Sequence, residues 1–388
     1  MLRLLHRQRV VHLLRTSGPL ARADLADRLG LARSSITAIV GELLDEGTLV
    51  ELDSRVEGPG YRGRPRTLLG CNPQAQRVLG IQIDGRRARV IVADATGTVS
   101  HEGETPTDGR NPASVIRSII RIAKQLMNDS TGGPVAAAGV CIPGFVDGPT
   151  GVVVESPELG WAKVELGRSI SRALGIPTAV QDTTQAMTLA EAIAGEARSA
   201  RSAVVLDYGG RIGVGLIIDG RPYTGGTGIA GAIGHVPVLG SHAPCQCGRT
   251  GCVDAHMSLV AMQAAAPQTA GMLYEDVDLD AVAEDTRQNP HSQNIIRDVI
   301  DRMSHTAMLI EALIDPELLI LGGLIMEFDE LADALETRIN EIRPPDRRGR
   351  TTTVRSQIRR DSPISVIVAL QQLDPDIAEM LRTPPLPN

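Results

Sequence analysis

The segment that decides the fold is Ala230–His256, which reads AGAIGHVPVLGSHAPCQCGRTGCVDAH. It holds three of the five cysteines, Cys245, Cys247 and Cys252, and His235 follows a glycine near its start. Three thiolates and one imidazole form the four-ligand tetrahedral set of a structural zinc site. Short cysteine spacings in an intracellular chain are typical of metal sites. The segment therefore predicts bound Zn²⁺ with a structural role.

Two alternatives remain open for this segment. His242 and His256 are further imidazoles close by, so the pattern alone does not fix the fourth ligand. Small buried cysteines are also common in protein cores and need not bind a metal. Only side chains that converge to metal-ligand distances decide between these possibilities.

The composition indicates a multidomain protein without a membrane segment. The chain has 388 residues, of which 42% are hydrophobic and 2% are aromatic, so we expect two or three domains with aliphatic cores. No apolar run is long enough for a transmembrane helix, and the N-terminus lacks the apolar core of a signal peptide. With an odd number of cysteines, these features predict a cytoplasmic protein with reduced thiols and no membrane partner.

Charge is distributed unevenly along the chain. Residues 1–70 contain eleven arginines and eight acidic residues, a net charge of +3. The rest of the chain contains 28 basic and 38 acidic residues, a net charge of -10. A small basic head on a large acidic body indicates that only the head contacts a polyanion.

The first 70 residues have the pattern of a winged helix-turn-helix domain. Apolar spacing and turn residues predict three helices followed by two short strands of a wing, at residues 3–16, 21–30, 33–47, 48–52 and 66–69. Ser34 or Ser35 is the expected N-cap of the third helix. Residues 71–79 are predicted to be a linker to the remainder of the chain.

The head carries hydrogen-bond donors at the positions that such domains use to contact DNA. The N-terminal residues of the third helix would enter the major groove, and the arginines of the wing would contact phosphates or the minor groove. The residues predicted to bind DNA are Arg33, Ser34, Ser35, Thr37, Arg62, Arg64 and Arg66. The alternative is a small protein-interaction domain with a solvated arginine loop.

Residues 80–388 alternate strand and helix patterns, which predicts an α/β body. Apolar strands at 78–83 and 203–207 open two similar cycles, and each ends in a glycine-containing turn. We therefore expect two related lobes, at about 80–185 and 200–388.

These features together resemble the ROK family (repressor, open reading frame, kinase) of the sugar-kinase and actin-like ATPase superfamily. The resemblance covers about residues 78–388, and the winged helix in front is similar to the transcriptional-regulator branch. The matching features are the Ala230–His235 step, the Cys-x-Cys-Gly-x-x-Gly-Cys run, Gly139–Asp147, Trp161 and Gly322-Gly323. The resemblance implies an actin-like two-lobed fold, zinc on His235, Cys245, Cys247 and Cys252, and a sugar pocket between the lobes.

The same resemblance allows the kinase chemistry to be examined. The first phosphate loop of family kinases, Asp-x-Gly-Gly-Thr, is Asp84-Gly85-Arg86-Arg87 here, and the second, Gly-Thr-Gly, is Gly209-Gly210-Arg211. The position of the catalytic aspartate falls on Thr183, whose hydroxyl cannot act as a base near neutral pH. Asp182 can replace it only with a shift of register. We therefore predict that the chain is not an enzyme and has no catalytic residue.

The sugar site implied by the resemblance is altered as well. Ala232 stands where the family has a glutamate, which removes a charge-assisted hydrogen bond to a sugar hydroxyl. Asp182, His235 and Asp254 remain as candidate effector ligands. This pattern predicts a modified, phosphorylated or oligomeric sugar as effector, or no effector.

The resulting prediction is a DNA-binding transcriptional regulator, a repressor of carbohydrate-related genes that responds to a sugar or sugar-derived effector. A homodimer or homotetramer would place two heads on the two half-sites of a double-stranded operator. Two alternatives remain: an ATP-dependent sugar kinase with a DNA-binding head, and an effector-independent regulator whose body serves for oligomerisation.

Overall fold

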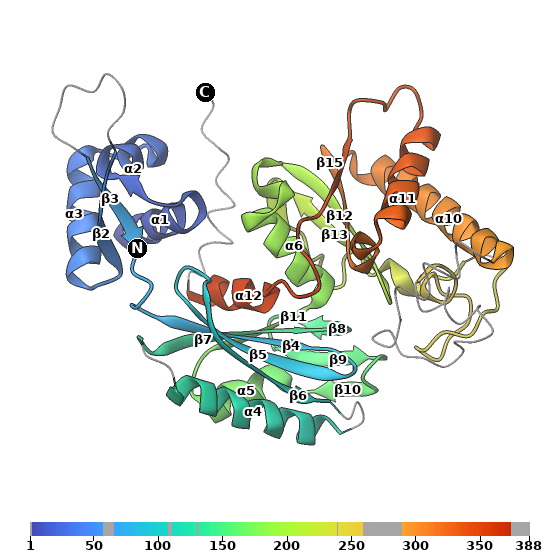
Figure 1. The fold of residues 1–388 in the computed structure, drawn as a ribbon, viewed down its shortest axis with the longest axis horizontal. Coiled ribbons are helices and arrows are strands. Elements are labelled where there is room, and N and C mark those ends of the chain that lie inside the picture. Colours follow the sequence, from blue (N-terminus) through green and yellow to red (C-terminus); the bar gives the residue numbers. More distant parts are fainter. Residues whose placement is uncertain are drawn as a thin grey trace.

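The computed structural model describes residues 2–56, 66–107, 111–129, 132–238, 240–258 and 289–373. An N-terminal unit of helices and a small sheet stands beside a body of two lobes (Figure 1). The predicted fold class, a winged helix-turn-helix followed by a two-lobed α/β body, is confirmed.

The N-terminal unit contains the predicted three helices and two wing strands, with one more short strand. Its elements are α1 (Leu2–Ser17), β1 (Leu20–Ala21), α2 (Arg22–Leu29), α3 (Arg33–Asp45), β2 (Leu49–Val56) and β3 (Arg66–Cys71). The strands form one sheet in the order β1-β3-β2. Its core is aliphatic, with Val10, Leu25, Ile36 and Leu69 fully buried. Residues 57–65 of the wing, with Arg62 and Arg64, lie outside the described residues.

The start of α3 differs from the prediction. Neither Ser34 nor Ser35 is the N-cap, because Ala32 occupies that position with extended backbone angles and no capping side-chain hydrogen bond. The preceding turn sets this boundary. Gly30 adopts a left-handed φ of 63°, and Leu31 N donates to the Ala26 carbonyl at 3.0 Å. The turn therefore fixes where the helix begins, and the two serines lie inside its first turn.

The segment between β3 and the body is fastened at both ends. On the head side, Asn72 Nδ2 donates to the Gly47 carbonyl at 2.7 Å. On the body side, Arg77 Nε donates to the Gly133 carbonyl at 2.6 Å. A Cβ on Gly133 would lie 2.4 Å from the Ala75 carbonyl oxygen, so the connector passes directly over this glycine. We call this connector, residues 72–76, the strap.

The first lobe is built on a five-stranded sheet of order β11-β7-β4-β5-β6. Helices α4 and α5 cover one of its faces, and α12 covers the other (Figure 1). A small sheet of order β8-β9-β10 lies beside it. The elements are β4 (Arg77–Ile83), β5 (Arg87–Asp94), β6 (Val99–Pro106), α4 (Pro112–Asp129), β7 (Val135–Ile142), β8 (Phe145–Asp147), β9 (Val152–Ser156), β10 (Trp161–Val164), α5 (Leu166–Leu174), β11 (Thr178–Asp182) and α12 (Ile364–Leu373).

The position of α12 corrects the predicted limits of the second lobe, because this helix returns to the first lobe. A Cβ on Gly139 of β7 would lie 2.3 Å from Ala369 N and 2.4 Å from the Ser365 carbonyl oxygen. The backbone of the helix therefore rests directly on the strand. Gly80 of β4 is similarly close, since its Cβ would lie 2.6 Å from Ser365 Oγ. Two glycines on neighbouring strands make the seat for α12.

The second lobe is built on a five-stranded sheet of order β14-β13-β12-β15-β16. Helices α10 and α11 pack on one face and α6 on the other. The elements are α6 (Thr183–Ala194), η1 (Glu196–Ser199), β12 (Ser202–Tyr208), β13 (Ile212–Ile218), β14 (Arg221–Pro222), η2 (Ile233–His235), α7 (Asp254–Met257), α10 (Pro290–Ile314), β15 (Leu318–Gly322), η4 (Leu324–Glu327), α11 (Asp329–Ile342) and β16 (Thr352–Arg355).

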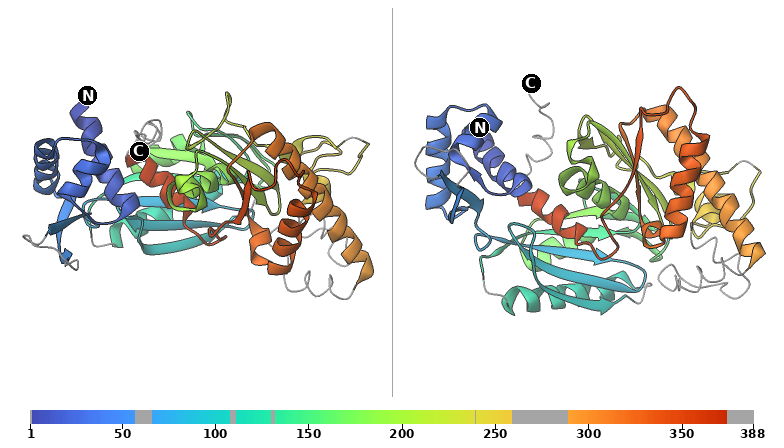
Figure 2. Two further views of the ribbon diagram at one scale, coloured as in Figure 1. Left: turned by 90° about the horizontal axis from the view of Figure 1, so that it is seen from above. Right: turned by 45° about the horizontal axis from the view of Figure 1, so that its top comes forward.

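The two lobes repeat one strand pattern. In the first, β4 pairs antiparallel with β5 and parallel with β7; in the second, β12 pairs antiparallel with β13 and parallel with β15. Helices α6 and α12 touch each other between the two sheets (Figure 2). Among the described residues, no helix combines the length and apolar character needed to cross a bilayer.

Candidate functional site

A cavity of about 220 Å³ lies where the two lobes face each other. Its walls come from the end of β11, the start of α6, the turn between β12 and β13, and the segments around residues 228–235 and 358–360. The three predicted effector ligands, Asp182, His235 and Asp254, all line this cavity. The structure thus brings together residues that are far apart in the sequence.

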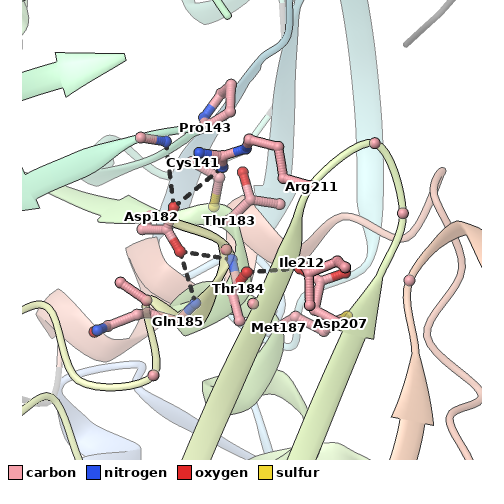
Figure 3. Close-up of a pocket in the computed structure, with 18 of the residues that line it drawn as sticks. Cys141, Pro143, Asp182, Thr183, Thr184, Gln185, Met187, Asp207, Arg211 and Ile212 are labelled. Carbon is pink, nitrogen blue, oxygen red and sulfur yellow. Dashed lines mark hydrogen bonds and ion pairs between the residues drawn. The ribbon is translucent and has the colours of Figure 1, made fainter. Parts of the chain in front are cut away.

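Asp182 has most of its hydrogen-bonding capacity engaged (Figure 3). It caps α6, because its Oδ1 accepts from Thr184 N at 2.9 Å and from Gln185 N at 3.4 Å. Its Oδ2 accepts from Gly144 N at 3.3 Å and lies 3.5 Å from Arg211 Nη2. The cap follows from the strand-to-helix junction at this point, where an aspartate satisfies free backbone N–H groups of the first turn.

Asp207, at the end of β12, is a cavity residue that the sequence reasoning did not single out. Thr184 Oγ1 donates a hydrogen bond to its Oδ2 at 2.6 Å. Burial raises the pKa of Asp207 to about 6; the Thr184 hydrogen bond and Arg211 oppose this, and Asp182 and Asp254 add to it. The available signal was an aspartate at the end of an apolar strand, before a glycine turn.

Arg211 lies among carboxylates from both lobes. Besides Asp182, it approaches Glu158, with 3.8 Å between Arg211 Nε and Glu158 Oε2. Burial by itself would lower the pKa of Arg211, but Asp182, Glu158 and Asp254 raise it above the ordinary value. The guanidinium therefore carries its charge inside the cavity. Glu158, in the turn between β9 and β10, has no sequence motif that would have identified it.

The turn after β4 is occupied by side chains of the protein itself. Asp84 Oδ1 accepts from Arg86 N at 3.0 Å and from Arg87 N at 2.7 Å. Gly85 N donates to Glu158 Oε1 at 3.2 Å. Three backbone N–H groups of this loop thus donate to carboxylates of the same chain, so a bound phosphate would have to compete with these internal acceptors.

The predicted metal ligands converge. The ligand atoms of His235, Cys245, Cys247 and Cys252 all lie within 4.8 Å of one another. Cys247 Sγ and Cys252 Sγ are 3.7 Å apart, and Cys245 Sγ lies 3.8 Å from His235 Nδ1. A tetrahedral zinc with bonds of about 2.3 Å to sulfur would place neighbouring ligands roughly 3.7 Å apart. The four residues therefore form a site that can hold a metal ion.

The other two imidazoles near this segment have different environments. His256 Nε2 is hydrogen-bonded to Ser241 Oγ, and His242 is exposed on the loop. Neither residue belongs to the converging set among the described residues. Of these three imidazoles, that of His235 belongs to the described group of four residues that could hold a metal ion.

The groups of the cluster differ in how readily they reach the ionisation state that a metal requires. Burial raises the pKa of Cys245 to about 12 and also raises that of Cys252, which favours the thiol at both positions. Hydrogen bonds from Arg249, Cys245 and Cys252 outweigh burial at Cys247 and lower its pKa to about 7, which favours the thiolate. Burial also lowers the pKa of His235, which favours the neutral imidazole that metals require. Asp254 Oδ2 lies 3.6 Å from His235 Nδ1, and its Oδ1 accepts from Ile212 N at 2.8 Å. Asp254 thus links the metal segment to the β12–β13 turn.

The predicted DNA-contacting residues of α3 share one exposed surface. Arg33, Ser34, Ser35 and Thr37 are all exposed in the first turns of the helix, and the Thr37 hydroxyl donates to the Arg33 carbonyl at 2.8 Å. Arg66 is placed only as the first residue of β3, with its backbone opposite Val56.

At the C-terminal end of α3, acidic side chains form ion pairs with arginines of α1. Arg7 Nη1 lies 3.1 Å from Glu42 Oε2, and Arg3 and Arg7 also pair with Glu42 and Glu46 respectively. Glu42 of α3 and its C-cap Glu46 are therefore paired with arginines of α1, whereas the first turn of α3, which contains Arg33, has no acidic residue. The exposed donors of α3 thus lie at the end of the helix that carries Arg33 and no acidic residue.

Comparison with known proteins places the body in a family. Residues 78–361, well over half of the chain, match the ROK family. The chain belongs to the ROK family. This confirms the resemblance drawn from the cysteine run and the glycine-histidine step.

The most similar curated ROK proteins include two repressors. The xylose repressor of Bacillus subtilis (strain 168) is 24% identical over 244 residues, which cover 62% of each chain. The DNA-binding transcriptional repressor Mlc of Escherichia coli (strain K12) is 28% identical over 254 residues, 63% of this chain and 61% of Mlc. The chain thus spans less than two thirds of the length of both relatives.

Two solved structures support the fold. A ROK family transcriptional regulator described as a homologue of E. coli Mlc superposes with a TM-score of 0.80 at 23% identity, covering 98% of both chains. A ROK glucokinase from Streptomyces griseus, in complex with glucose and AMPPNP, gives a TM-score of 0.63 at 21% identity and covers 78% of this chain and 99% of the kinase. The regulator matches head and body together.

Proposed function

We propose that this ROK protein is a DNA-binding transcriptional repressor whose two-lobed body binds a sugar or sugar-derived effector. The observation that carries the proposal is the row of exposed donors at the N-terminus of α3, on a winged helix-turn-helix joined to a body with an interlobe cavity. Residues 1–70 are then the DNA-binding head, and the strap, residues 72–76, is the part of the predicted linker 71–79 that lies between β3 and β4. The names of the relatives, xylose repressor and repressor Mlc, agree with this function.

The proposed protein acts as a cytoplasmic homodimer or homotetramer on double-stranded DNA. Two heads would read the two half-sites of a palindromic operator. An effector that prefers one arrangement of the lobes would change the separation of the heads, and with it the operator affinity. Regulation therefore needs no chemical step.

Kinase activity does not belong to the proposed function. Support comes from the loop after β4, whose N–H groups are taken by Asp84 and Glu158, and from Arg211 in the other loop. Phosphoryl transfer needs a free carboxylate base and accessible phosphate donors, and Asp182 is engaged as a helix cap. An ADP-release assay across a sugar panel tests this: sugar-dependent turnover that disappears in Asp182→Ala would establish the kinase instead.

The proposal includes structural zinc on His235, Cys245, Cys247 and Cys252. The convergence of one imidazole and three thiols at tetrahedral spacing supports zinc over the harder cations, which prefer oxygen ligands. The ion would fix the segment that carries His235, and the same residue lines the cavity. The metal thus orients a residue that faces the effector.

DNA binding is tested with Arg33→Ala and Arg64→Ala on genomic fragments selected by the full-length protein. Loss of a major-groove or phosphate contact should weaken binding roughly tenfold in each case. Arg172→Ala, an exposed arginine of α5 in the body, is the matched control and should bind as the wild type does. Unchanged affinity in both head variants would reject the proposed DNA-binding surface.

Effector binding is tested by repeating these measurements with and without D-xylose, D-glucose and their phosphates. A change in operator affinity with one of the sugars supports the inducible repressor. An affinity that no sugar alters would favour the effector-independent regulator, whose body serves for oligomerisation.

A further inference from the structure

Arg211 belongs to one lobe, and its two ion-pair partners belong to the other. It lies in the tight turn between β12 and β13 of the second lobe, where Gly209 N donates to the Arg211 carbonyl at 3.0 Å. Asp182 ends β11 of the first lobe, and Glu158 lies in the turn that joins β9 to β10. We call these three side chains the Arg211 cluster; it spans the cavity from lobe to lobe.

Both carboxylates of the Arg211 cluster accept a hydrogen bond from the backbone of the first lobe, and Asp182 also caps α6 of the second lobe through its Oδ1. Glu158 Oε1 accepts from Gly85 N, and Asp182 Oδ2 accepts from Gly144 N. Glu158 cannot follow the guanidinium without losing its hydrogen bond to the first lobe, whereas Asp182 lies at the junction of the two lobes. A separation of the lobes must therefore break the ion pair of Arg211 with Glu158, because the turn that carries Arg211 is itself held to the second lobe.

The ion pairs of the Arg211 cluster are long. The distances of 3.5 Å to Asp182 and 3.8 Å to Glu158 exceed the 2.7–2.9 Å that is typical of a charge-assisted hydrogen bond. The guanidinium side chain is also about one quarter exposed, at 27%, toward the cavity. A ligand with several hydroxyl groups can donate shorter hydrogen bonds to the same carboxylates. The geometry thus favours exchange of the arginine for such a ligand.

We propose that Arg211 is the positioning residue that couples occupation of the cavity to the arrangement of the lobes. A polyhydroxylated ligand donates to Glu158 and Asp182, displaces the guanidinium and releases the second lobe from the first. This inference rests on the proposed function for the identity of the ligand class. It adds the residue at which binding is converted into movement.

The chain contains a built-in reporter of this contact. Trp161 is its single tryptophan, is 1% exposed, and starts β10 directly after the turn that carries Glu158. Loosening of that turn should expose the indole to a quencher. Acrylamide quenching of the full-length protein therefore reads the Arg211 cluster without DNA or sugar.

In this experiment, we expect Arg211→Gln to increase the Trp161 quenching constant at least twofold over wild type. Glu158→Gln, which keeps the shape of the side chain, should produce the same increase, and the double variant should add nothing further. Arg168→Gln is the control, because Arg168 pairs with Glu165 within the first lobe and should leave quenching unchanged. Wild-type quenching in both cluster variants, or an increase in Arg211→Gln alone, would overturn the proposal.

Operator binding then separates this inference from the proposed function. Arg211→Gln should bind the selected fragment at least fivefold more weakly than wild type and lose most of the response to D-xylose or D-glucose. If wild type binds no fragment, the proposed function fails, while the quenching result still decides whether Arg211 holds the lobes. Increased quenching with unchanged operator affinity would overturn the coupling.

Discussion

The two lobes repeat one strand pattern, but their sheets meet the helices between them differently. In the first lobe, the glycine seat brings a strand against the backbone of α12, with Gly139 facing Ala369 N and the Ser365 carbonyl. In the second lobe, a Cβ on Gly213 would lie 2.4 Å from Thr184 Oγ1, so α6 meets its sheet through a side chain. The contact at Gly139 cannot change unless the whole helix moves, because it is made by backbone atoms. The contact at Gly213 is made by the Thr184 side chain, which belongs to a hydrogen-bond network.

That network belongs to the cavity. Thr184 donates to Asp207, and its own N–H group donates to Asp182. The turns after β4 and β12 differ in the same respect. In the turn after β4, backbone N–H groups donate to Asp84 of the same turn. The turn after β12 carries Arg211, whose side chain reaches across the cavity to Asp182. In the proposed regulator, the first lobe is therefore the fixed platform, and we expect the contacts of the second lobe to respond to a ligand in the cavity.

The largest difference between the lobes should appear when metal is removed. Among the described residues, the Cys/His cluster lies in the second lobe alone, and structural zinc contributes directly to folding. Chelation, or Cys252→Ser, should lower the thermal midpoint by on the order of 10 °C and increase hydrogen exchange in residues 232–257, with little change in β4 and β7. Cys71→Ser, in the head, is the control. An unchanged midpoint after verified metal removal would contradict this assignment.

A smaller effect is expected from adding one methyl group to Gly139, which contacts α12, or to Gly213, which contacts α6. Gly139→Ala pushes against the backbone of α12 and should cost roughly 3 kcal/mol, whereas Gly213→Ala meets the Thr184 side chain and should cost roughly half as much. Gly148→Ala, where a Cβ meets nothing within 4 Å, should be neutral. Urea unfolding measures all three. The test is which of the two substitutions lowers the free energy of unfolding more. A larger decrease in Gly213→Ala than in Gly139→Ala would contradict the view that the first lobe is the platform.

The smallest effect concerns two aspartates, Asp84 directly after β4 and Asp207 near the end of β12. The pKa of Asp207 is raised to about 6, so the folded protein holds its proton more tightly than the unfolded chain, and stability falls as pH rises from about 4 to 6. Asp207→Asn avoids that cost and should stabilise the protein by roughly 1–2 kcal/mol at pH 7.5, with little gain at pH 4.

Asp84→Asn supplies the contrast for this experiment, because Asp84 accepts two backbone hydrogen bonds and its loss of charge should destabilise the first lobe at pH 7.5. Thermal midpoints at both pH values distinguish the two variants. A gain in Asp207→Asn that is equal at pH 4 and pH 7.5 would exclude the titration of Asp207 as its cause.

The fold was predictable where the signal is local. Helical spacing in the head, apolar strands before glycine turns, and the repeated cycle are all properties of short windows. The N-cap of α3 was not predictable from these local signals. Serine is a favoured N-cap residue, but the turn at Gly30 sets the start of the helix and places Ala32 at that position. The return of α12 to the first lobe was hidden as well. Its seat consists of Gly80 and Gly139, far away in the sequence, and a glycine in a strand does not reveal what packs against it.

The site follows the same rule. The convergence of the proposed metal ligands was predictable because three of them lie within eight consecutive positions, Cys245–Cys252. The cavity residues Asp182, His235 and Asp254 came from a family resemblance, and all three line the cavity. Glu158 escaped notice because its partner Gly85 is 73 positions away and no motif surrounds either contact. Arg211 was noticed only as a residue that disturbs a glycine loop, since its role depends on charges contributed by the opposite lobe.

If the protein is the proposed repressor, the strap limits the operators that it can bind. Five residues, 72–76, span at most about 18 Å even when fully extended, and both ends are fastened to folded parts. In the proposed dimer, the heads therefore cannot move independently of the bodies. The distance between the two points where the straps join the bodies then determines the distance between the two heads. The protein would then not bind equally well to half-sites that lie one helical turn apart and to half-sites that lie two turns apart. The length of the strap would therefore contribute to operator selection together with the side chains of α3.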